Sequence, residues 1–277
     1  MHREIMAPSR GMDVDHVEFL WASEEINKDP DRYWSGVMKI ATHESVTRLQ
    51  RCATIMGRKG NIATINCPDC DAGIEIEDFS SMKASTIMYP IMQCNDVFFL
   101  DCDILQLGMD QRKVNILARE VCHHFARRKP VILSHHMLMG LQEGQEKMSK
   151  SKPNSAIFMT DTEDDINRKI KRAYCKPGDV DTNPIIDYTE HLIFPALKRE
   201  NRVFVINRHE KYGGELVYVD YNDLVVDFMN EILHPSDLKK AVKRELNVLL
   251  EPTRNYFKEN GKAKELLTRV RSLTKLS

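Results

Sequence analysis

Residues 147–152 concentrate charge and hydroxyl groups in the order Lys-Met-Ser-Lys-Ser-Lys. The residues just before them, 140–145, include two glycines and three polar side chains, a composition typical of loops. Lysine is a flexible point charge, so ammonium and hydroxyl groups clustered on a loop can close over a polyphosphate. A basic loop that is simply exposed to water is the plain alternative. The segment therefore predicts a loop near the middle of the chain, with phosphate binding as one of two open roles.

Ahead of this loop, segments of strand character alternate with segments of helical spacing. We expect short strands at residues 17–21 and 131–133. We expect helical segments, interrupted by turns in the first case, at residues 33–56, 89–99 and 111–124. The residues expected at helix starts are Ser23, Pro90 and Asp110. This alternation predicts an α/β fold with a parallel sheet, in which residues 131–133 form a buried strand.

Beyond the loop, the apolar spacing becomes helical throughout. Amphipathic helices are expected at residues 164–174, 187–197, 221–233 and 237–256. We therefore place a domain boundary near Ala156, with an α/β domain over residues 1–155 and a mostly α-helical domain over residues 156–277. From Ser236 onward, eleven lysines and arginines stand against five acidic residues. That excess suits either a surface for a phosphate backbone or a solvated helical face.

Composition excludes several classes of protein. The chain has 277 residues, a net charge of −1, 42% hydrophobic residues and 29% charged residues, which are ordinary values for a globular protein. Its 7 cysteines, an odd number in a chain of this size, indicate a reducing compartment. The N-terminal residues lack the apolar core of a secretory signal, and no apolar run is long enough to span a bilayer. We therefore expect a cytoplasmic protein with no membrane partner.

The segment 89–99 places polar side chains on one face of an otherwise apolar helix. Tyr89, Gln93 and Asp96 stand at positions i, i+4 and i+7. A phenol, an amide and a carboxylate on a buried helix either satisfy one another or line a pocket for a polar ligand. Gln111 projects from the first turn of the next helix, after the turn at Gly108. Ligands of open α/β sheets bind at such helix starts, although plain helix capping explains Gln111 equally well.

These motifs, taken in order, resemble the tyrosyl-tRNA synthetases of archaeal and eukaryotic type, a family of class I aminoacyl-tRNA synthetases. Residues 147–151 match the second signature of that class, KMSKS. The other segments that carry the resemblance are 89–96, 107–115, 133–138, 169–175, 210–214 and 233–239. The resemblance runs from about Val17 to the C-terminus. It implies a tyrosine–tRNA ligase, which activates L-tyrosine with ATP and Mg²⁺ and passes the tyrosyl group to its tRNA.

The resemblance also assigns the two domains and the loop between them. Residues 1–155 would be an incomplete Rossmann-like catalytic domain ending in the KMSKS loop, and residues 156–277 an α-helical anticodon-binding domain. Lys147 and Lys150 would be catalytic, because they would stabilise the phosphate charge of ATP during adenylate formation. The other loop residues assigned to ATP are Met148, Ser149 and Ser151. No metal ligand is implied among these residues.

The tyrosine pocket follows from the same resemblance. Tyr89, Gln93 and Gln111 would hold the amino group and backbone side of the substrate, and Asp96 would accept a hydrogen bond from its phenol. A buried acceptor of this kind rejects phenylalanine, which would leave the carboxylate unpaired. His135 and His136 would lie near the nucleotide, with structural hydrogen bonding as an open alternative.

For the tRNA, the resemblance points to Tyr212 and Asp237 as anticodon contacts. An aromatic ring can stack on a base, and a carboxylate can accept from the amino edge of guanine. Capping of its own helix is the other role open to Asp237. The family works as a homodimer, so we expect a homodimer, with the helix from Gln111 as a plausible contact.

The chain departs from the family pattern at its start. It shows no first strand, no motif of His-Ile-Gly-His type and no N-terminal tyrosine for substrate binding. We therefore expect a truncated form, or a half that pairs with another polypeptide. A catalytically inactive paralogue or partner half that binds tRNA is the alternative function.

Cys67 and Cys70 have the spacing of half a zinc site. A closed tetrahedral site needs two more ligands, and the sequence offers no second pair of this kind. Free thiols on a surface insertion are the other interpretation, and we expect no stoichiometric metal.

Overall fold

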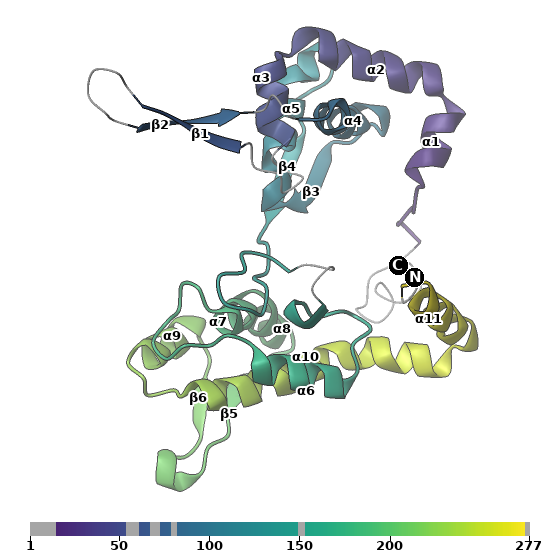
Figure 1. The fold of residues 1–277 in the computed structure, drawn as a ribbon. Helices are drawn as coiled ribbons and strands as arrows, with labels where there is room; N and C mark the ends of the chain where they lie inside the picture. Colours follow the sequence, from purple (N-terminus) through teal and green to yellow (C-terminus); the bar gives the residue numbers. More distant parts are fainter. Residues whose placement is uncertain (1–14, 54–60, 67–72, 79–81, 149–152, 275–277) are drawn as a thin grey trace. The chain divides into compact units, whose positions relative to one another are not determined.

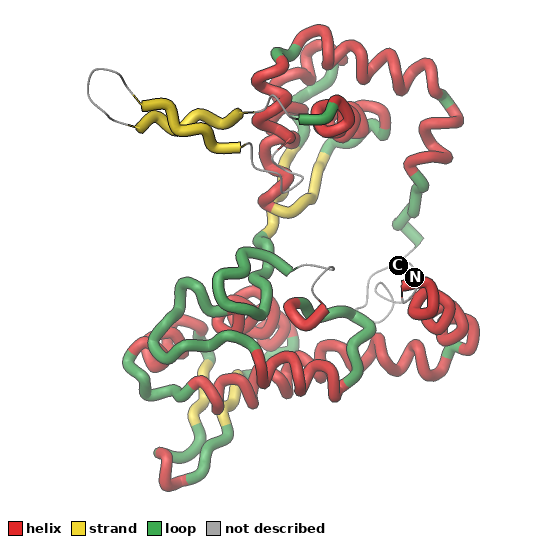
Figure 2. The backbone as a smooth tube through the Cα atoms, viewed as in Figure 1, coloured by secondary structure: helices red, strands yellow, loops and turns green. Residues whose placement is uncertain are grey.

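The computed structural model describes residues 15–53, 61–66, 73–78, 82–148 and 153–274. The chain divides into two compact units, and each has its own buried core. The first unit is Leu20–Met137, and the second is Leu138–Ser277 together with the residues before Leu20. Figure 1 labels the elements of both units, and Figure 2 colours them by type.

The first unit contains five α-helices and two strand pairs in its described part. The helices are α1 (Ala22–Lys28), α2 (Pro30–His43), α3 (Val46–Ala53), α4 (Ala84–Phe99) and α5 (Arg112–Val121). Single 3₁₀ turns flank α5, at Met109–Gln111 and Cys122–Phe125. The strands are β1 (Asn61–Asn66), β2 (Gly73–Asp78), β3 (Ile104–Gly108) and β4 (Val131–His135). β1 and β2 pair antiparallel, whereas β3 and β4 pair parallel with Ile104 opposite Val131.

The helix α2 buries one face against α4. Tyr33, Val37 and Ile40 follow one another at helical spacing, and each is at most 1% exposed. Between them, Gly36 allows a close approach of the two helices, because a Cβ added there would lie 2.1 Å from Oδ1 of Asn95. Asn95 in turn donates through Nδ2 to the backbone oxygen of Tyr33 across 3.1 Å. The α2–α4 contact therefore fixes the helix that carries the predicted polar stripe.

The parallel pair β3–β4, packed beside helices, confirms the α/β class. The prediction that residues 131–133 are buried is wrong, since Val131 and Leu133 are 51% and 52% exposed. Successive side chains of a strand point to opposite faces, and only one face of this pair packs on the core, through Leu105. Among the described residues, nothing covers the other face.

Four local expectations ahead of the KMSKS loop are wrong. Residues 17–21 form no strand, because strand propensity acts only through packing on neighbours and Trp21 is 72% exposed. Ser23 and Pro90 lie inside helices, since α1 begins at Ala22 and α4 at Ala84. Asp110 lies within the 3₁₀ turn, and Gln111 precedes α5.

The second unit is mostly helical, as predicted. Its α-helices are α6 (Glu163–Arg172), α7 (Pro184–Tyr188), α8 (Phe194–Arg199), α9 (Tyr221–Met229), α10 (Pro235–Glu259) and α11 (Gly261–Thr274). A π-helical turn, Thr189–Ile193, joins α7 to α8, so the helix expected over residues 187–197 exists but is irregular. The antiparallel strands β5 (Phe204–Ile206) and β6 (Leu216–Tyr218) lie beside α10.

The two units meet in sequence at Leu138, ahead of the predicted domain boundary near Ala156. The buried side chain of Leu141 belongs to the core of the second unit, so the described residues just after Leu138 pack with the helical part. The assignment of residues 1–155 and 156–277 to two functional domains stays a prediction. In the described part of the chain, no helix is long and apolar enough to cross a membrane.

Candidate functional site

The carboxylate of Asp96 is held by a residue that the sequence alone did not point to. Tyr33, on α2, donates through its hydroxyl to Oδ1 of Asp96 across 2.9 Å. Burial raises the pKa of Asp96, and the hydrogen bond from Tyr33 partly opposes that shift. Burial and the nearby carboxylate also raise the pKa of Tyr33. The pair is therefore a neutral phenol donating to a half-buried carboxylate.

The position of Tyr33 is itself fixed by packing. Its ring meets those of Trp34 and Phe99 edge-on, with centroids 5.5 and 5.1 Å away. The signal in the sequence was its place in the apolar spacing of α2, which marks Tyr33 as core but says nothing about the partner of its hydroxyl. Among the described residues, the structure gives the Asp96 carboxylate one hydrogen bond, and a carboxylate can accept more than one.

Gln93 and Gln111 form the second polar pair of the first unit. Nε2 of Gln93 donates to Oε1 of Gln111 across 3.1 Å, which joins α4 to the turn before α5. Each amide keeps one further group, an acceptor on Gln93 and a donor on Gln111, when the amides are assigned in this orientation. Those groups match the ammonium and carboxylate ends of an amino acid. Tyr89, one helical turn before Gln93, is 48% exposed.

The structure thus brings two of the four predicted tyrosine-binding residues into direct contact, and gives a third, Asp96, a different partner. The four assignments stay predictions. His135 and His136 are both exposed, and Nδ1 of His135 lies 3.3 Å from the backbone oxygen of His136.

In the second unit, the loop that leads to the KMSKS segment has an ordered base. The backbone N–H of Gly140 donates to the backbone oxygen of Gln145 across 3.0 Å. A Cβ at Gly140 would lie 2.2 Å from the Gln145 side chain, so a larger residue here would displace that side chain. Met148 is half-buried, and its N–H donates to the oxygen of Leu138 across 3.3 Å, while Lys147 is exposed. Residues 149–152, with Ser149, Lys150 and Ser151, lie outside the described residues, as do Cys67 and Cys70.

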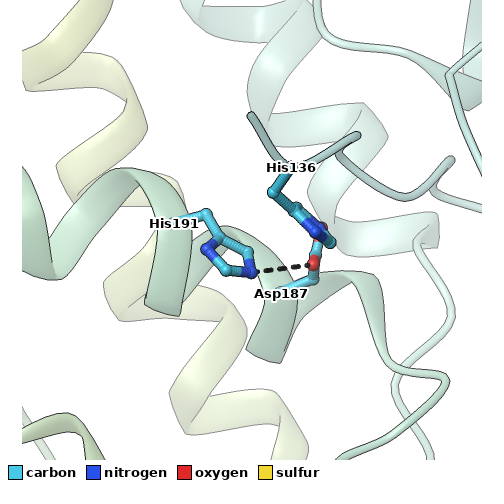
Figure 3. Close-up of side chains that lie close together, drawn as sticks. All are labelled: His136, Asp187 and His191. Carbon is cyan, nitrogen blue, oxygen red and sulfur yellow. Dashed lines mark ion pairs between the residues drawn. The ribbon is translucent and has the colours of Figure 1, made fainter. Parts of the chain in front are cut away.

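Two side chains of α7 hold the start of this loop. Asp187 accepts through Oδ2 from the N–H of Met139 across 2.9 Å, and the hydroxyl of Tyr188 donates to the oxygen of Met139 across 2.8 Å. The other carboxylate oxygen of Asp187 faces His191, whose Nε2 lies 3.7 Å away (Figure 3). Asp187 is 6% exposed and Tyr188 fully buried, so this anchor belongs to the core. In the sequence, the signal for this anchor was an acidic residue, Asp187, within the apolar run Pro-Ile-Ile-Asp-Tyr.

The far end of the loop is held by α6. Lys169 donates through Nζ to the oxygen of Ala156 across 2.9 Å and to Oδ2 of Asp161 across 2.7 Å. The ammonium group also lies over the Phe158 ring, 4.6 Å from its centroid. Ser155 accepts through Oγ from Nε2 of Gln145 across 2.9 Å, which links the two ends of the loop. The described residues on both sides of the basic segment are therefore held by hydrogen bonds within the second unit.

Tyr212 and Asp237 line one cavity of about 590 Å³. Tyr212 ends a 3₁₀ turn, is 64% exposed, and is followed by Gly213 and Gly214, both with positive φ. Asp237 lies in the first turn of α10 and receives a hydrogen bond from Nζ of Lys240 across 2.9 Å. The N-cap of α10 is His234, so the capping role considered for Asp237 is taken by another residue. A ring beside a carboxylate suits a base, and the anticodon assignment stays a prediction.

Comparison with known proteins places these features in a family. The family model of class I tRNA synthetases for Trp and Tyr matches residues 4–251. The cytoplasmic tyrosine–tRNA ligase 1 of Arabidopsis thaliana is 48% identical over 95% of this chain, which spans 63% of that relative's length. The tyrosine–tRNA ligase of Thermococcus sibiricus is 36% identical over 94% of this chain and 70% of its own length.

Solved structures agree with the sequence comparison. Leishmania major tyrosyl-tRNA synthetase in complex with tyrosinol superposes with a TM-score of 0.79 at 41% identity, covering 97% of this chain and 48% of that one. The Pyrococcus horikoshii enzyme, solved with L-tyrosine, gives 0.77 at 34% identity over 95% of this chain and 71% of that one. The family suggested by the polar stripe and the KMSKS loop is confirmed, and the chain belongs to the tyrosyl-tRNA synthetases of class I.

Proposed function

We propose that this chain acts as a tyrosine–tRNA ligase, activating L-tyrosine with ATP and transferring it to tRNA. The observation that carries the proposal is the half-buried carboxylate of Asp96, which accepts a hydrogen bond from the hydroxyl of Tyr33. Asp96 lies on the same face of α4 as Gln93, which donates to Gln111. The names of the relatives support the same reaction. The chain spans less than two thirds of the length of the first two relatives, so the activity of the whole enzyme is a proposal for this chain.

In this proposal, Asp96 selects the substrate. The hydroxyl of Tyr33 fixes the carboxylate through Oδ1, so Oδ2 can accept from the phenol of a bound tyrosine. Phenylalanine has no such donor and would leave a desolvated carboxylate with one partner fewer. Gln93 and Gln111 position the ammonium and carboxylate ends through their remaining acceptor and donor, and Tyr89 adds a phenol one helical turn away.

The KMSKS loop supplies the charge that the ATP phosphates require. The tyrosine carboxylate attacks the α-phosphorus, the bond to pyrophosphate breaks, and tyrosyl-adenylate forms. Lys147 and Lys150 stabilise the charge that develops on the phosphates, together with the Mg²⁺ that accompanies ATP as substrate. The exposed position of Lys147, next to the ordered base of the loop, suits this task, since the base fixes the start of the loop.

The second unit would bind the tRNA. Tyr212 would stack on an anticodon base and Asp237 would accept from its amino edge, within the cavity that both residues line. The terminal adenosine hydroxyl of the tRNA then attacks the carbonyl carbon of the adenylate, and AMP leaves. A homodimer and a cytoplasmic location complete the proposal; the name of the Arabidopsis relative gives the cytoplasmic location for that protein.

Tyrosine-dependent exchange of pyrophosphate into ATP, measured on the 277-residue chain, tests the activation step. Exchange that requires tyrosine and is not supported by phenylalanine is the expected result. Binding of tRNA without any exchange would favour the non-catalytic alternative. Asp237→Ala tests the tRNA role separately, because it should raise the KM for tRNA at least about tenfold while exchange is unchanged. Equal loss of both steps would show that Asp237 is needed for folding.

A further inference from the structure

A groove of about 230 Å³ lies between α2 and α4, which pack against each other in the first unit (Figure 1). It is lined by one face of α2, by an amide and two rings of α4, and by the ring of Phe125 in the turn after α5. This α2–α4 groove is smaller than the roughly 300 Å³ at which pockets for drug-sized ligands begin. It therefore suits a ligand with a single ring.

Two cations of α2, Arg32 and Lys39, line the groove without a counter-charge. The structure gives neither of them a carboxylate partner among the described residues, and no described carboxylate lines the groove. Nη2 of Arg32 donates to the backbone oxygens of Phe98 and Phe99 across 3.5 and 2.9 Å. Nζ of Lys39 donates to the backbone oxygen of His124 across 3.3 Å. Arginine offers five donors and lysine three, so both cations can also bind an external anion.

Aromatic rings hold both cations in position. The guanidinium of Arg32 lies over the ring of Phe99, 4.9 Å from its centroid, and the ammonium of Lys39 lies 5.2 Å from the centroid of Phe125. The ring of Phe125 stacks on that of Phe98, with centroids 4.1 Å apart. Because these side chains are positioned in advance, an anion would bind them with little loss of side-chain freedom. The rings also offer apolar surface to the body of the ligand.

The lining determines which anions fit the groove. An ammonium group on the ligand would face two cations and would lose its water without gaining a carboxylate partner from the described lining. Every amino acid carries such a group, including the tyrosine of the proposed reaction. An aromatic carboxylate that lacks an amino group has only the charge that the groove can neutralise.

The groove is connected to the pair formed by Tyr33 and Asp96. Two of its lining residues, Arg32 and Asn95, are the chain neighbours of that pair. Nδ2 of Asn95, a residue that is 2% exposed, donates to the backbone oxygen of Tyr33 across 3.1 Å. A ligand that displaces Asn95 would therefore shift α2 at Tyr33, and with it the donor to Asp96.

We propose that the α2–α4 groove binds a small aromatic carboxylate without an amino group, and that this ligand weakens the binding of tyrosine. Arg32 and Lys39 neutralise the carboxylate, the phenylalanine rings contact the ring of the ligand, and Asn95 transmits the displacement to Tyr33. The binding itself depends on the groove alone, whereas the effect on tyrosine rests on the proposed function.

Titration of the full chain with 3-phenylpropionate tests the binding. Tryptophan fluorescence is the readout, since the ring of Trp34 on α2 lies 5.5 Å from that of Tyr33. We expect the double variant Arg32→Gln, Lys39→Gln to bind the probe at least about tenfold more weakly, because both charged contacts are lost. L-Phenylalanine, which is the same probe with an added ammonium group, should also bind at least about tenfold more weakly than 3-phenylpropionate.

The matched control is Arg128→Gln, Lys129→Gln, which removes the same two residue types from exposed positions outside the groove. It should bind the probe within about twofold of the parent chain. Equal affinities of the groove and control variants would overturn the proposal, as would a parent chain that does not bind the probe. The exchange Arg32→Lys, Lys39→Arg keeps both charges and should keep binding. Its failure to bind would show that charge is not the cause.

Equilibrium dialysis of labelled L-tyrosine, with and without saturating 3-phenylpropionate, tests the effect on tyrosine. The Kd for tyrosine should rise at least about threefold in the parent and control chains and stay unchanged in the groove variant. An unchanged Kd in the parent chain would overturn this part of the proposal. A chain that binds the probe through Arg32 and Lys39 but binds no tyrosine would instead defeat the proposed function.

Discussion

The hydroxyl of Tyr33 donates to Oδ1 of Asp96 across 2.9 Å and so connects α2 to the carboxylate of α4. The two residues are 63 positions apart in the chain. Their contact gives the carboxylate a fixed direction before any substrate binds, which is the condition for discrimination by a hydrogen bond. It also leaves a half-buried charge in the free protein, whose burial raises the pKa of Asp96.

Asp96→Asn should separate substrate recognition from stability. We expect tyrosine-dependent exchange to fall by about two orders of magnitude, the loss of a charged hydrogen bond being roughly 1.5–3 kcal/mol, while the KM for ATP is unchanged. Stability should rise at neutral pH, because the amide removes a charge that burial disfavours. The folded pKa of Asp96 lies above its unfolded value of about 3.9, so ionisation subtracts stability as pH rises through the folded pKa.

Urea unfolding of the parent chain and of Asp96→Asn at about pH 4.5 and pH 7 measures the difference in their free energies of unfolding. We expect Asp96→Asn to gain more stability at pH 7 than at pH 4.5. Tyr33→Phe is the matched variant, since it keeps the ring packing and removes only the donor. It should raise the pKa of Asp96 further. Unchanged tyrosine activation in both variants would mean that the pair is structural.

The helices could be predicted from the sequence to a greater extent than the site. Apolar spacing located α2, α5, α6, α9 and α10, because a helix face that packs on a core repeats locally. Spacing also placed Tyr89, Gln93 and Asp96 on one helix, and the family resemblance is confirmed by the comparisons. The hydrogen-bond partners could not be predicted from the sequence. Neither the Tyr33–Asp96 contact nor the Asp187–Met139 contact has a local signal, because each joins separate elements.

The strands were harder to predict from the sequence than the helices, for a physical reason. Residues 17–21 and 131–133 have equally strong strand composition, yet only the second group finds a parallel neighbour, in β3. Pairing and burial of a strand depend on what lies beside it, which composition does not contain.

Gly36→Ala should destabilise the first unit although alanine favours a helix. In an exposed helix the change stabilises by about 0.8–1 kcal/mol. Here the new Cβ would lie 2.1 Å from Oδ1 of Asn95, whose side chain is buried and bonded to Tyr33, so strain of roughly 1–3 kcal/mol is expected instead. Urea unfolding followed by tryptophan fluorescence measures it, since Trp21 and Trp34, the 2 tryptophans of the chain, both lie in this unit. A stabilised variant would show that α2 and α4 are farther apart.

Three histidines at the ends of α2 and α5 should make the first unit sensitive to acid. The ring of His124 lies 3.8 Å from that of His43 and 3.9 Å from that of His123, centroid to centroid. Partial desolvation, then the charges of His123, His43 and Lys39, lower the pKa of His124. The unfolded state, with a pKa of about 6.5, therefore binds the proton more readily, and stability is lost as pH falls below that value.

Thermal unfolding followed by tryptophan fluorescence between about pH 7.5 and pH 5.5 checks this. His124→Gln should flatten the decline in Tm, because the uncharged amide removes the proton linkage. His209→Gln, in the other unit, is the control and should leave the fluorescence transition of the first unit as it is. A decline equally steep in His124→Gln would assign the acid sensitivity to other groups.

Lys169→Met should be the most damaging of these changes, and its effect should reach the KMSKS loop. Lys169 and Asp161 form an ion pair at 2.7 Å with side chains 4% and 9% exposed. Removing the ammonium leaves the Asp161 carboxylate buried without its counter-charge, which typically costs about 3–5 kcal/mol. It also removes the donor to Ala156, and so loosens the end of the loop that follows Lys147 and Lys150.

Far-UV circular dichroism should show the helical second unit unfolding at lower urea concentration, while tryptophan fluorescence, which reports the first unit, is unchanged. Asp161→Asn is the paired variant: it keeps an acceptor for Lys169 but leaves the ammonium without its buried counter-charge, so a smaller loss is expected. Under conditions where Lys169→Met is still folded, the KM for ATP should rise several-fold, because the loop loses its fixed end. A folded variant with normal ATP use would show that Lys169 serves stability alone and that the loop is held from its other end, by Asp187 and Tyr188.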